Sequence, residues 1–215
     1  MNKYEVIFFD LDGTLTDPGD GITNSVAHAL KKYGIEVTDR TELYKFIGPP
    51  LHESFEKFYG FSREEAMKAV EYYREYYKVK GIYENSVYEG IETLLKKLKE
   101  SEKKIVLATS KPEIFAKEIL RHFAIDKYFD FIAGSNLDGT RTVKAEVIEY
   151  ALSNCSVTDK NTVVMIGDRE HDIIGAKKNG IDSIGVLFGY GSREELENAV
   201  ATYIAETVND IEKLI

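Results

Sequence analysis

Residues 6–17 read VIFFDLDGTLTD, in which four apolar residues lead directly into a pair of aspartates. The apolar run predicts a strand that is buried on both faces. Asp10 and Asp12 are two positions apart, so on a strand their carboxylates would lie on the same side. Two like charges 4 Å apart near a protein surface repel by about 4 kcal/mol, so the pair indicates a cation, a lysine or a shared proton nearby. An acidic turn would explain the pair alone, but Gly13 and the threonines after it favour a ligand.

The composition limits the class of protein. A chain of 215 residues can form one large domain, or a core domain with an insertion. Its 43% hydrophobic and 30% charged residues are typical of a folded, soluble protein. The formal net charge of −9 argues against a nucleic-acid polymer as the main partner, but a small anionic substrate beside a local cation remains compatible with it.

The sequence also favours a cytoplasmic location. Cys155 is the only cysteine, so no intrachain disulfide can form and a reducing compartment is expected. We see no apolar signal region before the first strand and no apolar run of about eighteen residues, so no membrane association is expected. The chain is expected to be a monomer or a homodimer.

Residues 18–82 carry helical patterns without a strand-like run. Asp20 is a plausible N-cap for the first of these helices, and Gly34 is a plausible stop. The Gly-Pro-Pro sequence at residues 48–50 interrupts the region, because neither proline can continue a helix. The expected helices cover residues 21–33, 41–46, 51–58 and 63–77.

From Val87 onward, strand patterns alternate with helical ones, which predicts an α/β fold with a parallel sheet. We therefore expect a core made of residues 1–17 and 83–215, with residues 18–82 inserted after the first strand. Hinges between the two parts are expected in the turn-rich segments at residues 16–20 and 81–86. Further strands are expected at residues 104–108, 129–133, 162–166 and 183–188, and further helices at residues 113–123, 143–152, 173–179, 193–199 and 208–215.

The polar residues at the carboxyl ends of these strands are the candidate site, because ligands of such sheets bind beyond those ends. Any one of them could be an ordinary polar residue at a strand end. Together they bring carboxylates, hydroxyls and a lysine to one edge of the sheet. They are Asp10, Asp12, Thr109, Ser110, Lys111, Lys144 and Asp168.

These residue types favour phosphoryl chemistry with a metal ion. Asp10, Asp168 and Asp172 offer hard oxygen ligands without a cluster of histidines or cysteines, which suits Mg²⁺. Hydroxyls and a lysine suit phosphate oxygens. An ionised aspartate can attack phosphorus, and the leaving alkoxide then needs a proton from a second carboxyl group. The Asp10 and Asp12 pair can supply both groups.

These segments resemble the four motifs of the haloacid dehalogenase (HAD) superfamily, in the same order along the chain. DLDGTL at residues 10–15 resembles the first motif, and TSKP at residues 109–112 resembles the second. Lys144 resembles the third, and GDREHD at residues 167–172 resembles the fourth. The phosphoglycolate phosphatase-like branch, which includes bacterial proteins called 5′-nucleotidases, is the closest branch. The resemblance implies a Rossmann-like parallel sheet core with the first strand at its centre and an inserted all-α cap domain.

The resemblance also implies a role for each motif residue. Asp10 is expected to be the nucleophile and Asp12 the general acid and base. Lys144 is expected to neutralise the nucleophile and the transferring phosphoryl group. The residues expected to bind the substrate phosphate are Thr109, Ser110 and Gly13.

The same resemblance implies Mg²⁺ as the cofactor. Asp10, Asp168 and the backbone carbonyl of Asp12 are expected to hold the ion, and Asp172 is expected to orient its waters. Closure of the cap would exclude bulk water and select the leaving group. The expected activity is hydrolysis of a small phosphate monoester through an aspartyl phosphate, with phosphoglycolate or a nucleoside 5′-monophosphate as candidate substrates.

The residue at position 12 distinguishes a phosphatase from some other activities of this superfamily. Asp12 argues against a dehalogenase, which needs no acid at that position, and against a phosphonatase, which would carry a small residue there. A phosphomutase keeps both aspartates and stays open as an alternative. A non-catalytic regulator is disfavoured because every motif position is filled.

Two aromatic segments have no firm role at this point. The tyrosine-rich run at residues 72–77 could pack the cap, contact another subunit or stack on a nucleotide base. Residues 188–191, which read FGYG, follow the last expected strand and could contact the substrate. They lack the spacing of a dinucleotide-binding fingerprint. Asp17 has no matched role and is interpreted as a loop residue near the hinge.

Overall fold

A computed structural model describes residues 3–215. The chain divides into two compact units, and each is described by itself. The larger unit ends its first segment at Asp17 and resumes at Val87, and the smaller unit covers Pro18–Ser86. Residues 1–2, which the sequence analysis assigns to the core, lie outside the described residues.

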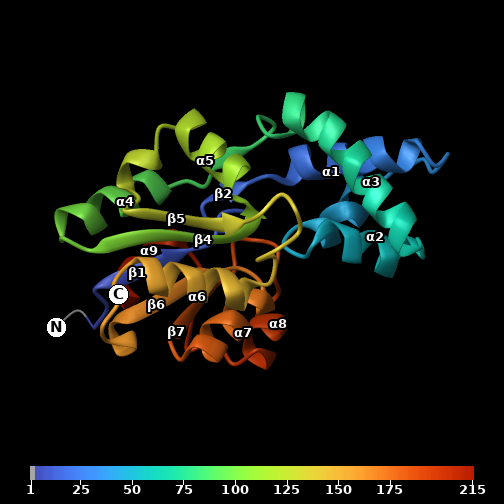
Figure 1. The fold of residues 1–215 in the computed structure, drawn as a ribbon. Helices are drawn as coiled ribbons and strands as arrows, with labels where there is room; N and C mark the ends of the chain where they lie inside the picture. Colours follow the sequence, from blue (N-terminus) through green and yellow to red (C-terminus); the bar gives the residue numbers. More distant parts are fainter. Residues whose placement is uncertain (1–2) are drawn as a thin grey trace. The chain divides into compact units, whose positions relative to one another are not determined.

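The larger unit is built on a parallel sheet, as predicted (Figure 1). Within residues 3–215 this sheet has six strands in the order β5-β4-β1-β6-β7-β8, so the first strand lies near the centre. This confirms the predicted fold class. The strands are β1 (Val6–Phe9), β4 (Lys104–Pro112), β5 (Phe131–Ser135), β6 (Val163–Gly167), β7 (Asp182–Val186) and β8 (Tyr203–Ala205).

Helices cover both faces of this sheet because successive strands are joined by helical crossovers. Figure 1 shows α4 and α5 on one face and α6 and α7 on the other. On the α6 face, Val147 and Ile148 pack against Phe8 of β1 in one buried cluster. The helices are α4 (Ile91–Glu100), α5 (Glu113–His122), α6 (Lys144–Asn154), α7 (Glu170–Asn179), α8 (Arg193–Asn198) and α9 (Val208–Leu214).

The smaller unit is helical. Ser62 caps one of its helices in a capping box with Glu65, in which each side chain accepts a hydrogen bond from the other residue's backbone N–H. Phe46 and Phe55 pack with ring centroids 5.0 Å apart in its interior. Its elements are α1 (Gly19–Lys31), the 3₁₀ helix η1 (Arg40–Phe46), α2 (Leu51–Tyr59), α3 (Arg63–Tyr76) and the π-helical turn η2 (Tyr77–Gly81). The short strand β2 (Thr16–Asp17) precedes this unit in the sequence and pairs with β3 (Ser86–Val87), at the unit's last residue and the one after it.

The end of the inserted segment differs from the sequence analysis, which starts the second core segment at residue 83. The structure assigns residues 83–86 to the smaller unit. Glu84 explains the difference, because its carbonyl accepts a hydrogen bond from Gly21 N at 3.0 Å. Its carboxylate also accepts bonds from Asn24 Nδ2 and Tyr76 Oη, each at 2.9 Å. These bonds hold the segment onto α1 and α3.

Other differences are local. Helix α1 begins at Gly19 with Pro18 at its N-cap, so Asp20 lies inside the first turn and is not the cap. Strand β4 extends to Pro112, four residues past its predicted end, with an irregular register between Ala108 and Pro112. The 3₁₀ geometry of η1 and the strand β8 have no counterpart in the sequence analysis.

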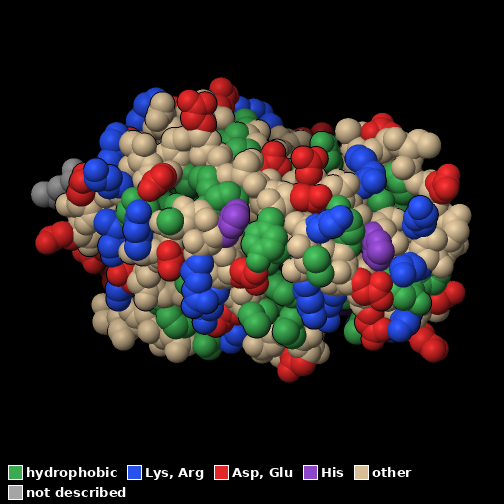
Figure 2. All heavy atoms as spheres, turned by 90° about the horizontal axis from the view of Figure 1, so that it is seen from above, with side chains coloured by type: hydrophobic (Ala, Val, Ile, Leu, Met, Phe, Trp, Pro, Cys, Tyr) green, Lys and Arg blue, Asp and Glu red, His purple; other side chains and the backbone are tan. Residues whose placement is uncertain are grey.

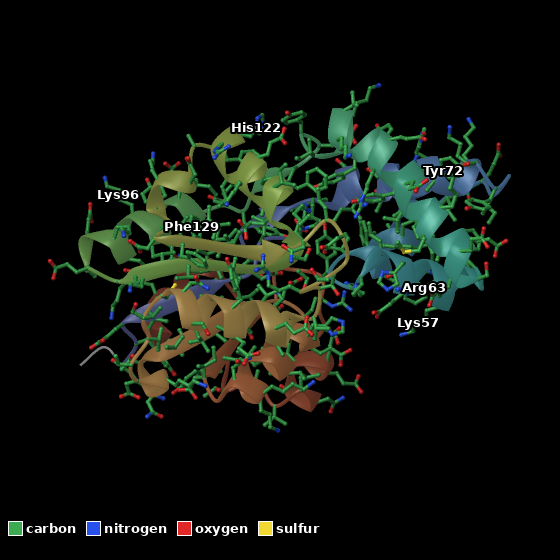
Figure 3. All side chains as sticks on the ribbon, viewed as in Figure 1. Lys57, Arg63, Tyr72, Lys96, His122 and Phe129 are labelled. Carbon is green, nitrogen blue, oxygen red and sulfur yellow. The ribbon has the colours of Figure 1, made fainter. Side chains whose placement is uncertain are left out.

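The tyrosine-rich run at residues 72–77, which spans the end of α3 and the start of η2, contributes to the packing of the smaller unit. Tyr73 and Tyr77 are buried and stack with ring centroids 5.2 Å apart. Tyr72, labelled on α3 in Figure 3, lies against Tyr33 with ring centroids 6.0 Å apart.

In the part of the chain that the structure describes, we find no helix with the length and apolar character needed to cross a membrane. The face shown in Figure 2 carries acidic and basic side chains in small, interspersed groups.

Candidate active site

The site begins at the carboxyl end of β1. Asp10 directly follows this strand and donates its backbone N–H to Ile166 O of β6 at 2.9 Å. Strand β1 lies between β4 and β6, and all three strands run parallel. Residues near the carboxyl ends of these strands therefore meet at one edge of the sheet, which brings Thr109, near the end of β4, and Asp168, after β6, to the edge that holds Asp10.

A cluster of buried carboxylates lies at this edge. Asp10, Asp168 and Asp172 each offer an oxygen atom within 4.8 Å of the others. Asp168 follows β6, and Asp172 lies in the first turn of α7. The glycine before Asp168 makes this arrangement possible, because a Cβ at Gly167 would overlap the Asp172 carboxylate. The structure thus brings together three acidic residues that the sequence analysis singles out.

Lys144, the first residue of α6, bridges two of these carboxylates. Its Nζ lies 2.6 Å from Asp10 Oδ1 and 2.7 Å from Asp172 Oδ1, and it donates a further bond to Ala108 O at 3.0 Å. Burial alone would lower the pKa of Lys144, but the charges of Asp10 and Asp172 outweigh that effect and raise it. The lysine therefore remains a cation and fixes the positions of both acids.

One lysine cannot balance three buried carboxylates. Burial raises the pKa of Asp168 well above its ordinary value, and the charges of Asp172 and Asp10 raise it further. Within residues 3–215, Asp168 Oδ1 is buried and has no hydrogen-bond partner. A divalent cation with hard oxygen ligands fits this donor set, because it would supply both the missing charge and a partner for that oxygen. The residues present thus fit Mg²⁺.

Asp12 lies outside this cluster and has its own lysine. Lys111 donates a hydrogen bond to Asp12 Oδ2 at 2.6 Å, and both side chains are largely buried. Burial raises the pKa of Asp12, and the neighbouring Lys111 partly opposes that rise. Asp12 therefore has different surroundings from Asp10, and these surroundings favour a proton on the Asp12 carboxyl group.

Lys111 is a site residue to which the sequence analysis assigns no role. The reason lies in β4, which was expected to stop at residue 108 but continues to Pro112. Thr109 and Lys111 are two positions apart, so on an extended strand they share one side, as Asp10 and Asp12 were expected to do. Applying that spacing rule to residues 109–111 could have placed the Lys111 side chain on the same side as Thr109, although Lys111 itself is among the candidate site residues.

The predicted phosphate-binding residues occupy different settings. Thr109 is buried, and its Oγ1 accepts a hydrogen bond from Lys111 N at 3.2 Å. Ser110 is partly exposed on β4. Gly13 has a φ of 82°, and a Cβ at this position would overlap the Asp168 carboxylate. The glycine therefore allows the first motif to approach Asp168 closely.

Residues 189–191, the GYG segment, pack directly on Asp168. Tyr190 N donates a hydrogen bond to Asp168 Oδ2 at 2.8 Å, and the Tyr190 hydroxyl donates one to Asp17 Oδ1. Side chains at Gly189 or Gly191 would overlap Asp168. The sequence analysis allows a substrate contact for this segment, and the structure places its backbone against the carboxylate cluster. Asp17, interpreted from sequence as a plain loop residue, holds the Tyr190 hydroxyl.

The fold and the site together define a class of protein. Residues 7–186 match the family model of haloacid dehalogenase-like hydrolases, and the chain belongs to that family.

Named relatives point to a phosphatase within this family. The chain is 50% identical over 194 residues to a 5′-nucleotidase of Pseudomonas aeruginosa, covering 90% of this chain and 87% of that protein. It superposes with a TM-score of 0.95 on a predicted phosphatase from Clostridium acetobutylicum, at 51% identity, covering 98% of this chain and 97% of the other. It is also 38% identical over 214 residues to the tyrosine-protein kinase PtkA of Mycobacterium tuberculosis, covering 98% of this chain and 72% of that protein.

Proposed function

We propose that this protein is a Mg²⁺-dependent phosphatase that hydrolyses a small phosphate monoester in two steps, with Asp10 as the nucleophile. The observation that carries the proposal is the buried cluster of Asp10, Asp168 and Asp172 bridged by Lys144. Asp10, Asp168 and the Asp12 carbonyl would hold the ion, and Asp172 would orient its waters. When bound, Mg²⁺ would supply positive charge to the phosphoryl oxygens.

In the first step, a carboxylate oxygen of Asp10 attacks phosphorus in line with the ester oxygen. The bond between Asp10 and phosphorus forms while the ester bond breaks. The ester oxygen leaves as an alkoxide and takes the proton of the Asp12 carboxyl group. Lys144 holds Asp10 in position and offsets the charge of the phosphoryl group.

The second step releases phosphate. Asp12, now ionised beside Lys111, accepts a proton from a water molecule that attacks the phosphorus of the aspartyl phosphate. The bond between phosphorus and Asp10 breaks, and Asp10 returns to its carboxylate form. Asp12 is protonated again and ready for the next cycle. In this scheme Thr109, Ser110 and the backbone of Gly13 bind the phosphate oxygens.

We further propose that the smaller unit acts as a cap that selects the leaving group, with the chain acting as a hinge near residues 16–20 and 81–86. A nucleoside 5′-monophosphate is the favoured substrate class, since the 50% identical relative is named a 5′-nucleotidase. Phosphoglycolate is the second candidate from the sequence resemblance. The single buried cysteine accords with action in the cytoplasm.

The test is phosphate release from a panel of nucleoside monophosphates, phosphoglycolate and sugar phosphates, with Mg²⁺ or with EDTA. Wild type should release phosphate only with Mg²⁺, and Asp10→Asn should lose at least about a thousandfold in rate. Asp126→Asn, a substitution in the short helix η3 (Asp126–Tyr128) away from the site, is the control and should keep full activity. Turnover in EDTA, or an active Asp10→Asn variant, would contradict the proposal.

Transfer of the phosphoryl group to an acceptor other than water is the second candidate function. It is favoured by the relative named a tyrosine-protein kinase, which is 38% identical. The same assay, with an alcohol added as phosphoryl acceptor, separates the two functions when substrate loss and free phosphate are both measured. Hydrolysis yields equal amounts of each, whereas transfer consumes substrate without free phosphate.

A further inference from the structure

The GYG segment makes a direct hydrogen bond to the carboxylate cluster. Its middle residue, Tyr190, donates its backbone N–H to Asp168 Oδ2 at 2.8 Å. The other oxygen of that carboxylate, Oδ1, is buried and lacks a hydrogen-bond partner among the described residues. The bond from Tyr190 therefore fixes the orientation of Asp168 and leaves Oδ1 for a cation.

The side chain of Tyr190 anchors this segment to the first motif. Its hydroxyl donates a hydrogen bond to Asp17, the last residue of β2. The segment and the first motif also meet at Gly189, where a Cβ would overlap Gly13 O. Just before the segment, Phe188 packs edge-on against Tyr88 with ring centroids 5.2 Å apart.

The two flanking glycines make the tyrosine anchor important. A glycine on each side of Tyr190 lets the backbone approach Asp168 and Gly13 closely. Phe188 and the contact at Gly189 fix the chain before Tyr190, and the remaining restraint must act on Tyr190 itself. The hydroxyl bond to Asp17 supplies that restraint.

We propose that Tyr190 is a positioning residue for the cation site, acting through Asp168. Its hydroxyl, held by Asp17, keeps the backbone N–H on Asp168 Oδ2 and so keeps Oδ1 aimed at the cation. This inference rests on the proposed function, because it requires that the cluster of Asp10, Asp168 and Asp172 binds a divalent ion. It assigns the FGYG stretch to metal binding instead of substrate contact.

The experiment measures binding of Mn²⁺ alone to the full chain stripped of metal with EDTA and then freed of the chelator. The electron paramagnetic resonance signal of unbound Mn²⁺ gives Kd without turnover, and Mn²⁺ suits the same oxygen ligands as Mg²⁺. Tyr190→Phe removes only the hydroxyl, and the Kd of this variant for Mn²⁺ should rise about three- to tenfold. This factor lies at or below the low end of the affinity losses that follow mutation of residues hydrogen-bonded to metal ligands. The Mg²⁺ concentration that gives half-maximal activity should rise by the same factor.

Three further variants separate the hydrogen bond from other effects. Asp17→Ala should raise Kd as Tyr190→Phe does, and the double variant should be no worse than either single one. Asp17→Asn keeps an oxygen acceptor and should change Kd less than twofold. Tyr128→Phe is the matched control. It removes a hydrogen bond of 3.2 Å from a tyrosine hydroxyl to Glu92 of α4, and it should bind Mn²⁺ as tightly as wild type does.

The outcomes are distinct. If Tyr190→Phe and Asp17→Ala bind Mn²⁺ as tightly as wild type does, the positioning role is wrong while the proposed function stands. If Asp17→Asn loses as much affinity as Asp17→Ala, the charge of Asp17 and not the hydrogen bond is responsible, and the inference is also overturned. If wild type itself binds no Mn²⁺, the cation site and the proposed function fail together.

Discussion

At the scale of single residues, the site separates two aspartates that the sequence presents as a pair. Asp10 shares Lys144 with Asp172, whereas Asp12 is held by Lys111. Each lysine comes from a different segment, α6 in one case and the extended end of β4 in the other. This division gives the two carboxyl groups different surroundings, which a nucleophile and an acid both require.

Replacing Lys144 with methionine tests the charge balance of the cluster. In EDTA, the variant leaves buried carboxylates without their counter-charge, and its free energy of unfolding should fall by about 3 kcal/mol. Mg²⁺ should restore part of this loss because the ion replaces the missing positive charge. Denaturant unfolding with and without Mg²⁺ measures both effects, and Lys160→Met on an exposed surface is the control. If Mg²⁺ raises the free energy of unfolding of neither wild type nor Lys144→Met, a cation site at the cluster is contradicted.

Replacing Lys111 with methionine tests the role of its bond to Asp12. Without the lysine, the pKa of the buried Asp12 should rise further, so Asp12 would be a weaker acid and would donate its proton to the leaving alkoxide less readily. We expect kcat/KM for the best substrate to fall about ten- to a hundredfold. Lys117→Met removes a comparable bond, of 2.6 Å to Glu113, outside the site and should leave kcat/KM unchanged. Wild-type kcat/KM in Lys111→Met would show that Lys111 does not support Asp12.

At the scale of elements, the sequence predicts those strands and helices that follow from a local pattern of apolar and polar residues. The buried run of β1 and the alternation of strands with helices after residue 87 were enough to predict the parallel sheet. The extension of β4 beyond residue 108 is not predicted from the sequence because Ser110 and Lys111 are polar, whereas in the structure Pro112 pairs with Ser135 of β5 after a shift in register. The bond from Lys111 to Asp12 and the contacts of Tyr190 depend on such long-range pairing, which spacing along one segment does not encode.

The amino end of β7 offers a pH-dependent test of stability away from the site. Burial alone would raise the pKa of Asp182, but hydrogen bonds from Lys3 and Tyr4 outweigh it and lower the pKa below its ordinary 3.8. A carboxyl group with a lowered pKa in the folded state stabilises the protein above its unfolded pKa. That contribution is lost as the pH falls through the folded value.

Asp182→Asn should therefore lower the free energy of unfolding at pH 7 by up to about 1 kcal/mol, since the group is partly solvent-exposed. The difference from wild type should narrow as the pH falls below about 4. Urea unfolding at several pH values measures this difference in the free energy of unfolding, with Asp126→Asn as the control. A difference that stays constant down to pH 2 would contradict the ionic origin of this contribution.

At the scale of the whole molecule, the chain divides the two tasks that we propose between two units. The larger unit contains every predicted site residue, from Asp10 to Asp172. The smaller unit is a separate helical body inserted after β2, and the residues that would select a substrate are not identified by any of the four motifs. This is why the sequence predicts the reaction more precisely than the substrate.

The stereochemical course at phosphorus tests the covalent intermediate most directly. The substrate carries sulfur and two different oxygen isotopes on phosphorus, which make the phosphorus chiral. It is hydrolysed in water that contains the third oxygen isotope, and the configuration of the released thiophosphate is then determined. Attack by Asp10 followed by attack of water comprises two in-line displacements, each of which inverts phosphorus, so we predict net retention. Net inversion would mean that water attacks the substrate directly, and it would contradict the role of Asp10 as the nucleophile.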